Sequence, residues 1–135
     1  MQVFRLQKRV LRILAGLSSS ESCRGSFRRL GLLTLPGLYL LSIVKLVKRN
    51  SHLLKKVSDF HNYPTRNKEN VRIPLVRLST TQRCDPMQVG SRLYNALPHV
   101  IRELPAGTFG RVVKNHLLEA EPYSIEEFFG IEWKV

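Results

Sequence analysis

The sequence PGLYLLSIVKLVKR at residues 36–49 is apolar almost all round and predicts a helix at the centre of the fold. Pro36 suits the first turn of this helix, and Asn50 is placed to take the left-handed conformation just after its end. Cations gather near its C-terminus, where the helix dipole favours positive charge. We expect this helix to form the core, with shorter helices packed around it.

Two helices are predicted before this central one. The first runs from Val3 to Leu17, and the second begins near Ser20 or Ser22, either of which could cap it, and ends at Gly31. We expect the apolar side of the first helix to be the packed one, and it comprises Val3, Leu6, Val10, Ile13, Leu14 and Leu17.

Short helices are also predicted in the C-terminal half, over residues 90–97, 98–104 and 108–120. Thr108 is expected to cap the third of them. Ser124 and Glu127 have the spacing of a capping box, which predicts a last short acidic helix that ends at Gly130.

The segment between these groups of helices lacks helical periodicity. Residues 61–70 (HNYPTRNKEN) predict a loop, and residues 71–78 predict an extended segment in which Pro74 allows an edge strand at best. The fold class expected is mainly α, a small bundle of short helices with a basic loop and at most one short edge strand or hairpin. Within one domain or fragment we distinguish a basic helical part (1–58), a basic loop and extended part (59–83) and short helices with an acidic tail (84–135).

The net charge of +12 over 135 residues is concentrated in the first part of the chain. Residues 1–83 hold 17 Lys and Arg against three acids, whereas residues 84–135 hold five against seven. Such an excess favours a polyanionic partner, above all RNA or DNA.

Membrane spanning and secretion are not expected. The apolar run from Leu30 to Val47 is interrupted by polar and helix-breaking residues, so no membrane partner is predicted. Cys23 and Cys84 indicate a reduced, intracellular chain of the cytoplasm or nucleus, with a single structural disulfide as the alternative. Residues 1–30 are rich in Arg and Ser with Glu21 as the sole acid, which is also typical of a mitochondrial transit peptide.

Independent catalysis is not predicted. Two-metal polymerase chemistry needs carboxylates that converge on magnesium ions, but the two aspartates, Asp59 and Asp85, lie far apart in the sequence. The four histidines show no zinc-binding spacing, and no phosphate-binding glycine loop or serine nucleophile motif occurs. We therefore expect no metal, no cofactor and no enzymatic activity.

Two candidate nucleic-acid-binding sites remain. The first is the row of cations Arg5, Lys8, Arg9 and Arg12, which lie one turn apart and could follow a phosphate backbone; the alternative is a solvated basic side of a core helix. The second is the loop that contains His61, Tyr63, Arg66 and Lys68. There a ring could stack on an unpaired base while the cations contact phosphates; the alternative is a turn whose Tyr63 packs on the protein.

Seven blocks in a fixed order carry a resemblance that covers nearly the whole chain. They are LQKRVLRIL (6–14), SCRGSFRRLGLLTLPGLYL (22–40), VKRN (47–50), HNYPTRNK (61–68), RIPLVRLSTTQ (72–82), LYNALP (93–98) and YSIEEFF (123–129). Together they resemble the C-terminal region of reverse transcriptases from non-long-terminal-repeat retrotransposons of the jockey-like kind.

The resemblance implies a region that follows the polymerase palm and lacks the catalytic aspartates of RNA-directed DNA polymerases. It implies no catalytic residue here, but a place beside template and primer, which favours the nucleic-acid interpretation of Lys8, Arg9, Arg12 and the 61–68 loop. The chain departs from the family pattern at Gly37, where a Ser is common, and lacks a Glu often present in the central helix.

Three hypotheses follow. The first is a non-catalytic fragment of a retrotransposon reverse transcriptase that binds RNA or DNA nonspecifically. The second is a helical interaction module that packs on the polymerase portion of the parent protein through its apolar central helix. The third is a basic mitochondrial protein. The sequence leaves the oligomeric state open.

Overall fold

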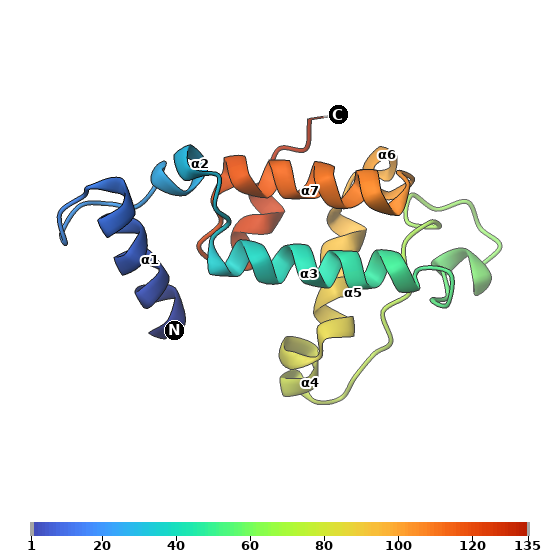
Figure 1. Cartoon of the computed structure of the whole chain (residues 1–135). Coiled ribbons are helices and arrows are strands. Elements are labelled where there is room, and N and C mark those ends of the chain that lie inside the picture. Colours follow the sequence, from blue (N-terminus) through green and yellow to red (C-terminus); the bar gives the residue numbers. More distant parts are fainter. Residues whose placement is uncertain (1, 135) are drawn as a thin grey trace. The chain divides into compact units, whose positions relative to one another are not determined.

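The computed structural model describes residues 2–134, apart from the side chains of residues 81–83. Its regular structure is helical, and over the described residues the only β pairing is an isolated bridge, so the prediction of a mainly α fold is confirmed (Figure 1). The elements are α1 (Gln2–Ala15), α2 (Ser26–Leu30), α3 (Leu35–Asn50), the 3-10 turn η1 (Val57–Asp59), α4 (Ser79–Cys84), α5 (Pro86–Ala96), α6 (His99–Arg102), α7 (Ala106–Ala120) and the 3-10 turn η2 (Glu126–Gly130).

The chain forms two compact units that interleave along the sequence. The first unit comprises Met1–Leu41 and Arg111–Glu132, and the second comprises Ser42–Gly110 and Trp133–Val135. Both α3 and α7 therefore contribute one part to each unit.

The predicted central helix is confirmed as α3. Its apolar residues Leu40, Ile43, Val44 and Val47 are buried, and Pro36 is its second residue. The expectation for Asn50 was wrong, because Asn50 is the last residue of the helix itself. Among non-glycine residues of the described chain, positive φ occurs at Glu121 instead.

The packed side of α1 differs from the one predicted. Phe4 and Leu11 are buried, and the side chain of Gln7 between them bonds the backbone of Leu33 and Leu35 at 2.9 and 2.8 Å. The aliphatic spacing gave no indication of this side, where the loop before α3 satisfies both polar groups of the Gln7 amide. The aliphatic row therefore faces solvent, with five members 55–76% exposed: Val3, Leu6, Val10, Ile13 and Leu14.

A small aromatic core holds the first unit together. Phe4 and Phe27 are buried, and the ring of Tyr123 packs against both, with its centroid 5.0 Å from that of Phe4 in an edge-to-face arrangement. Gly31 ends α2 with φ of 68°, as its position predicts, because only glycine adopts this conformation without strain.

The buried carboxylate of Glu121 supplies the cap that the serines were expected to give. Neither Ser20 nor Ser22 caps α2; instead Glu121 accepts bonds from the backbone N–H groups of Gly25 and Arg28, at 2.5 and 2.6 Å. A carboxylate at this position satisfies otherwise unpaired donors and favours the helix dipole.

The second unit is built around a close contact between α5 and α3. A Cβ added at Gly90 would lie only 2.6 Å from Ile43 Cγ2 and 2.7 Å from Val47 Cγ2, so glycine is required for this approach. The predicted helix 90–97 begins earlier, at Pro86, because the side chain of Asp85 caps it by accepting a bond from Met87 N at 3.0 Å.

The segment 71–78 is not a strand. A single antiparallel bridge joins Lys56 to Val71, and the side chain of Asn95 bonds both the N–H and the carbonyl of Val71, at 2.8 and 2.9 Å. The pairing does not extend along the segment, and α4, which was not predicted from the sequence, begins at Ser79.

Two further caps were predicted wrongly. The helix α7 begins at Ala106, before Thr108, so Thr108 is not its cap. The capping box at Ser124 does not form; the residue before η2 is Ile125, and Glu127 accepts a bond from Tyr123 N at 3.1 Å.

Candidate nucleic-acid interface and anion pocket

The four cations predicted on α1 divide into two groups. Arg5, Arg9 and Arg12 line one shallow cavity of about 410 Å³ together with Ile13, Leu17 and Ser19. Lys8 instead lies with its Nζ 4.8 Å from the centroid of the Phe4 ring. We call Arg5, Arg9 and Arg12, with the exposed aliphatic row, the α1 surface.

Internal contacts involve Arg12 of this surface and the neighbouring Lys8. The Nε of Arg12 donates to the carbonyl of Glu21 at 2.9 Å, and the cation–π contact of Lys8 extends to Tyr123 at 5.5 Å. Arg5 and Arg9 have exposed side chains. The α1 surface therefore offers cations beside aliphatic side chains, with no acid in the helix.

The predicted loop is present in the second unit, and residues 61–68 are all exposed. Its base is closed by backbone bonds from Ser58 N to Lys68 O at 2.9 Å and from Val57 N to Asn70 O at 3.0 Å. Tyr63 is 79% exposed, so the alternative in which its ring packs on the protein is wrong. The ring is available for stacking beside two cations of the same loop, Arg66 and Lys68.

A second exposed ring with cations lies directly before this loop. The guanidinium carbon of Arg72 lies 3.8 Å from the centroid of the Phe60 ring, and Lys55 Nζ lies 5.5 Å from it. Sequence reasoning missed this arrangement because Arg72 was assigned to an extended segment. The sequence signal that could have found it is Phe60, the aromatic residue next to His61 in a stretch rich in cations. We call His61, Tyr63, Arg66, Lys68, Phe60 and Arg72 the loop surface.

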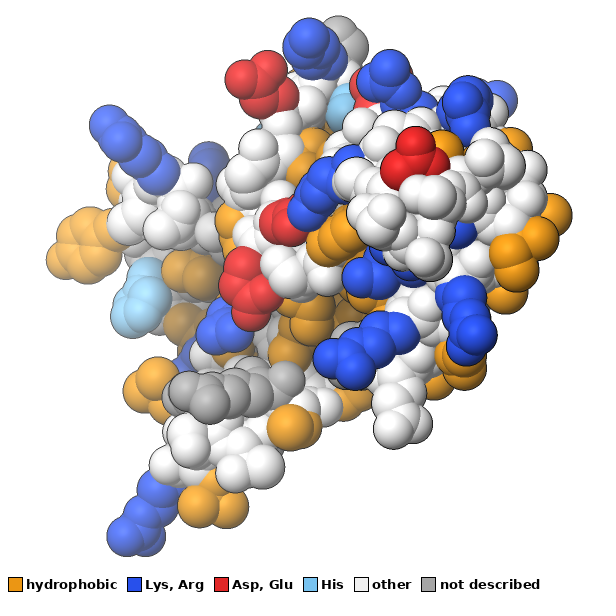
Figure 2. Space-filling model, turned by 90° about the vertical axis from the view of Figure 1, so that its left-hand side faces the viewer, with side chains coloured by type: hydrophobic (Ala, Val, Ile, Leu, Met, Phe, Trp, Pro, Cys, Tyr) orange, Lys and Arg blue, Asp and Glu red, His pale blue; other side chains and the backbone are white. Residues whose placement is uncertain are grey.

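An open groove of about 860 Å³ adjoins Phe60 and Arg72. Its walls combine apolar side chains, among them Leu53 and Leu75, with the cation of Lys55. Figure 2 shows that exposed blue cations and orange hydrophobic side chains also lie side by side on the face that it presents, where red acidic side chains are fewer.

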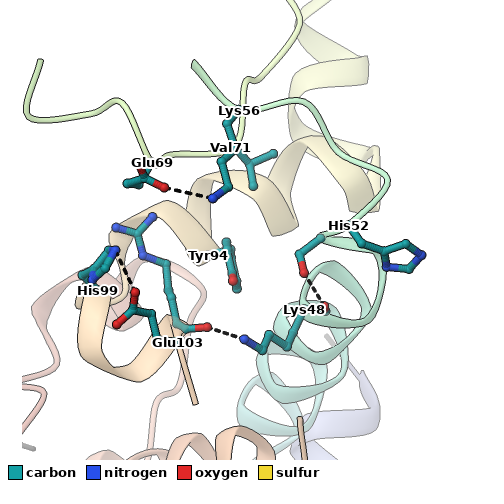
Figure 3. Close-up of a pocket in the computed structure, with 10 residues that line it drawn as sticks. Lys48, His52, Lys56, Glu69, Val71, Tyr94, His99 and Glu103 are labelled. Atoms are coloured by element: carbon teal, nitrogen blue, oxygen red, sulfur yellow. Dashed lines mark hydrogen bonds and ion pairs between the residues drawn. The ribbon is translucent and has the colours of Figure 1, made fainter. Parts of the chain in front are cut away.

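A separate pocket of about 330 Å³ lies within the second unit (Figure 3). We call it the Lys48 pocket. The Nζ of Lys48 donates to the backbone carbonyl of Arg102, and Tyr94 lies between the helices that carry these two residues. Its lining residues are Lys48, Ser51, His52, Lys56, Glu69, Val71, Tyr94, His99, Arg102 and Glu103.

Both acids of the Lys48 pocket lie beside a basic side chain. Glu69 pairs with Lys56 at 2.9 Å, which holds the pKa of Glu69 below its usual value, and Glu103 lies 3.5 Å from His99. Burial lowers the pKa of Lys48, and the nearby Glu103 offsets only part of that effect. Burial also raises the pKa of the Tyr94 hydroxyl.

The guanidinium of Arg102 is only partly satisfied by hydrogen bonds. Its Nη1 donates to Asn70 Oδ1 at 2.8 Å, and its Nε is buried without a hydrogen-bond partner. The pocket therefore presents a lysine and an arginine whose described hydrogen bonds go to neutral oxygen atoms.

The part of the chain that the structure describes was also compared with the patterns of metal sites and membrane spans. No cluster of three or more potential metal ligands occurs there, and no helix is long and apolar enough to cross a membrane. Both cysteines are free thiols, Cys23 buried and Cys84 exposed.

Comparison with protein-family models, curated proteins and solved structures finds no significant match. The functional inference therefore rests on the surfaces and the pocket described above.

Proposed function

We propose that the chain binds single-stranded RNA or DNA through the loop surface, as a non-catalytic segment of a retrotransposon reverse transcriptase. The observation that carries the binding site is the 79% exposure of Tyr63 in a loop with Arg66 and Lys68. An exposed ring beside cations fits an unpaired nucleotide, since the ring stacks on the base and the cations neutralise phosphates. The link to reverse transcriptases rests on the order of sequence blocks.

The neighbouring Phe60 extends the same chemistry. The guanidinium carbon of Arg72 lies 3.8 Å from the centroid of the Phe60 ring. A stacked pair of an arginine and an aromatic ring is itself a platform for a base. Two rings on either side of His61 give the loop surface room for more than one base. Binding through stacking and phosphate contacts is tolerant of sequence, so we expect similar affinity for oligonucleotides of different sequence.

The proposal is tested by anisotropy titration of a labelled oligouridine with the wild-type chain and with Tyr63→Ala. Stacking contributes about 1 to 3 kcal/mol per base, so we expect an affinity loss of about 5- to 150-fold. Tyr39→Ala is the matched control, because Tyr39 is also an exposed tyrosine but lies on α3. Equal affinity of the Tyr63 variant and the wild type would remove the loop from the site.

The exposed aliphatic row of α1 supports a second candidate function, a packing module for another protein. Leu6, Val10 and Ile13 are more than half exposed. A contiguous exposed apolar row of this kind is typical of a protein interaction site. The partner proposed is the polymerase portion of the parent reverse transcriptase. The sequence predicted this contact for the central helix, but the apolar residues Leu40, Val44 and Val47 of that helix are buried within the fold.

Sedimentation velocity tests this second function. We expect the chain to self-associate through the row, and a polymerase portion supplied in trans to suppress the association. The triple variant Leu6→Ser, Val10→Ser, Ile13→Ser should remain monomeric. A wild-type chain that is monomeric and ignores the polymerase portion rules the packing function out.

A further inference from the structure

We propose that the Lys48 pocket binds a phosphate group, a ligand class that goes beyond the strand binding assigned to the loop surface. The pocket collects side chains from α3, the segment before η1, α5 and α6 (Figure 3). Its volume of about 330 Å³ holds a phosphate together with part of the molecule that carries it.

Charge is unevenly distributed within the pocket. Lys56 pairs with Glu69 at 2.9 Å, and the imidazole of His99 lies 3.5 Å from Glu103. The described hydrogen bonds of Lys48 and Arg102 go to neutral oxygens, the carbonyl of Arg102 and the side-chain oxygen of Asn70. A dianion would give these two cations a direct anionic partner.

The two cations have complementary chemistry. A guanidinium offers a planar set of donors that matches phosphate oxygens, and an ammonium group supplies a compact point charge. Arg102 is positioned for this role by its bond to Asn70 at 2.8 Å, and Lys48 by its bond to the neighbouring main chain. A bound phosphate also offsets the burial of Lys48, because it stabilises the charged ammonium.

The rest of the wall combines apolar and polar side chains. The lining includes Tyr94, a buried aromatic residue of α5, and the aliphatic Val71. The guanidinium carbon of Arg102 lies 6.0 Å from the centroid of the Tyr94 ring. This mixed wall suits a phosphate group that is attached to an organic molecule.

The test is a calorimetric titration with inorganic phosphate at constant ionic strength. Lys48→Gln keeps a donor for the carbonyl of Arg102 but removes the charge, and we expect affinity to fall about tenfold or more. Lys45→Gln is the matched control, because Lys45 lies on the same helix and does not line the pocket. Circular dichroism of each variant verifies that it is folded.

Two results overturn the proposal. One is the failure of the wild-type chain to take up phosphate saturably at concentrations up to about 10 mM. The other is an equal loss of affinity in Lys48→Gln and Lys45→Gln, which would assign the effect to net charge. Because the wild-type titration suffices for the first result, the test holds even if a variant does not fold.

A second arm identifies the source of the phosphate group. The affinities of 5′-phosphorylated and 5′-hydroxyl trinucleotides are compared for the wild type and Lys48→Gln. A gain from the 5′-phosphate that disappears in Lys48→Gln supports the end of a strand as the ligand. Uptake of inorganic phosphate without such a gain supports a small phosphorylated compound. Tyr63→Ala should leave phosphate affinity unchanged, so failure of the strand-binding proposal is distinguishable from failure of this one.

Discussion

The α1 surface and the loop surface are both exposed and cationic, yet they differ in the apolar groups beside their cations. On α1 the neighbours are aliphatic, among them Leu6 and Ile13, whereas in the loop they are the rings of Tyr63 and Phe60. Aliphatic side chains suit the irregular surface of a protein, and flat rings suit the face of a base. Similar charge therefore supports different partners, and the apolar neighbours decide between them.

The largest expected effect is on the free energy of unfolding, and it tests whether the aliphatic row of α1 is exposed in solution. Leu40 on α3 is 0% exposed and Leu6 on α1 is 57% exposed. We expect Leu40→Ala to lower the free energy of unfolding by about 2 to 5 kcal/mol because it leaves a cavity in the core. Leu6→Ala should lower it by less than about 0.5 kcal/mol.

Urea unfolding of both leucine variants measures these changes in dilute solution. Both substitutions remove the same atoms from a helix, so helix propensity is matched and burial is the difference. A cost for Leu6→Ala as large as that for Leu40→Ala would show that the row on α1 is packed in solution and end the comparison.

A medium effect concerns the anchor of the loop surface. Asn95 bonds both polar backbone groups of Val71, and Asn95→Ala removes the two bonds together. We expect a loss of about 1 to 3 kcal/mol in the free energy of unfolding, with faster amide exchange at residues 55–72. Asn115→Ala, at an exposed position of α7, is the control that should change neither quantity. Unaltered exchange in Asn95→Ala indicates that the loop is held by other contacts.

The smallest effect is an ion pair in the first unit. Arg24 lies 3.1 Å from Glu127, and this bond holds the pKa of Glu127 below its usual value. The carboxylate therefore stabilises the fold above the unfolded pKa of 4.5, and this contribution is lost as the pH falls through the lower folded pKa. We expect Glu127→Gln to cost less than about 1 kcal/mol at pH 7, since the pair is exposed.

Thermal unfolding of Glu127→Gln and the wild type at pH 7 and pH 2 measures this dependence. The two chains should differ at pH 7, and the difference should shrink at pH 2, because protonation removes the charge of the carboxylate. A difference that persists at pH 2 would mean that Glu127 acts through packing.

The sequence predicts the helical class and the burial of α3, because the spacing of apolar residues along a helix does not depend on which elements pack against it. It fails for α1, where the bonds of Gln7 to the loop before α3 determine which side packs. The cap on α2 also escaped prediction, because Glu121 reaches it from a residue far along the chain. Such long-range polar contacts leave no local pattern.

The candidate sites were predictable to different extents. The exposed loop with Tyr63, Arg66 and Lys68 follows from local composition, since nothing in it favours burial. The stacked pair of Phe60 and Arg72 and the Lys48 pocket do not, because the turn at η1 and the bridge at Val71 bring distant residues together. The spacing of these residues along the sequence does not indicate that they are in contact.

The salt dependence of single-stranded RNA binding tests the central claim most directly. For a single strand the slope of log affinity against log salt is about 0.7 per neutralised phosphate, so Arg66→Ala with Lys68→Ala should flatten it by about 1.4. The matched pair Arg5→Ala with Arg9→Ala on α1 should flatten it by less than half as much. A slope that is unchanged in the loop variant and flattened in the α1 variant would contradict strand binding by the loop surface.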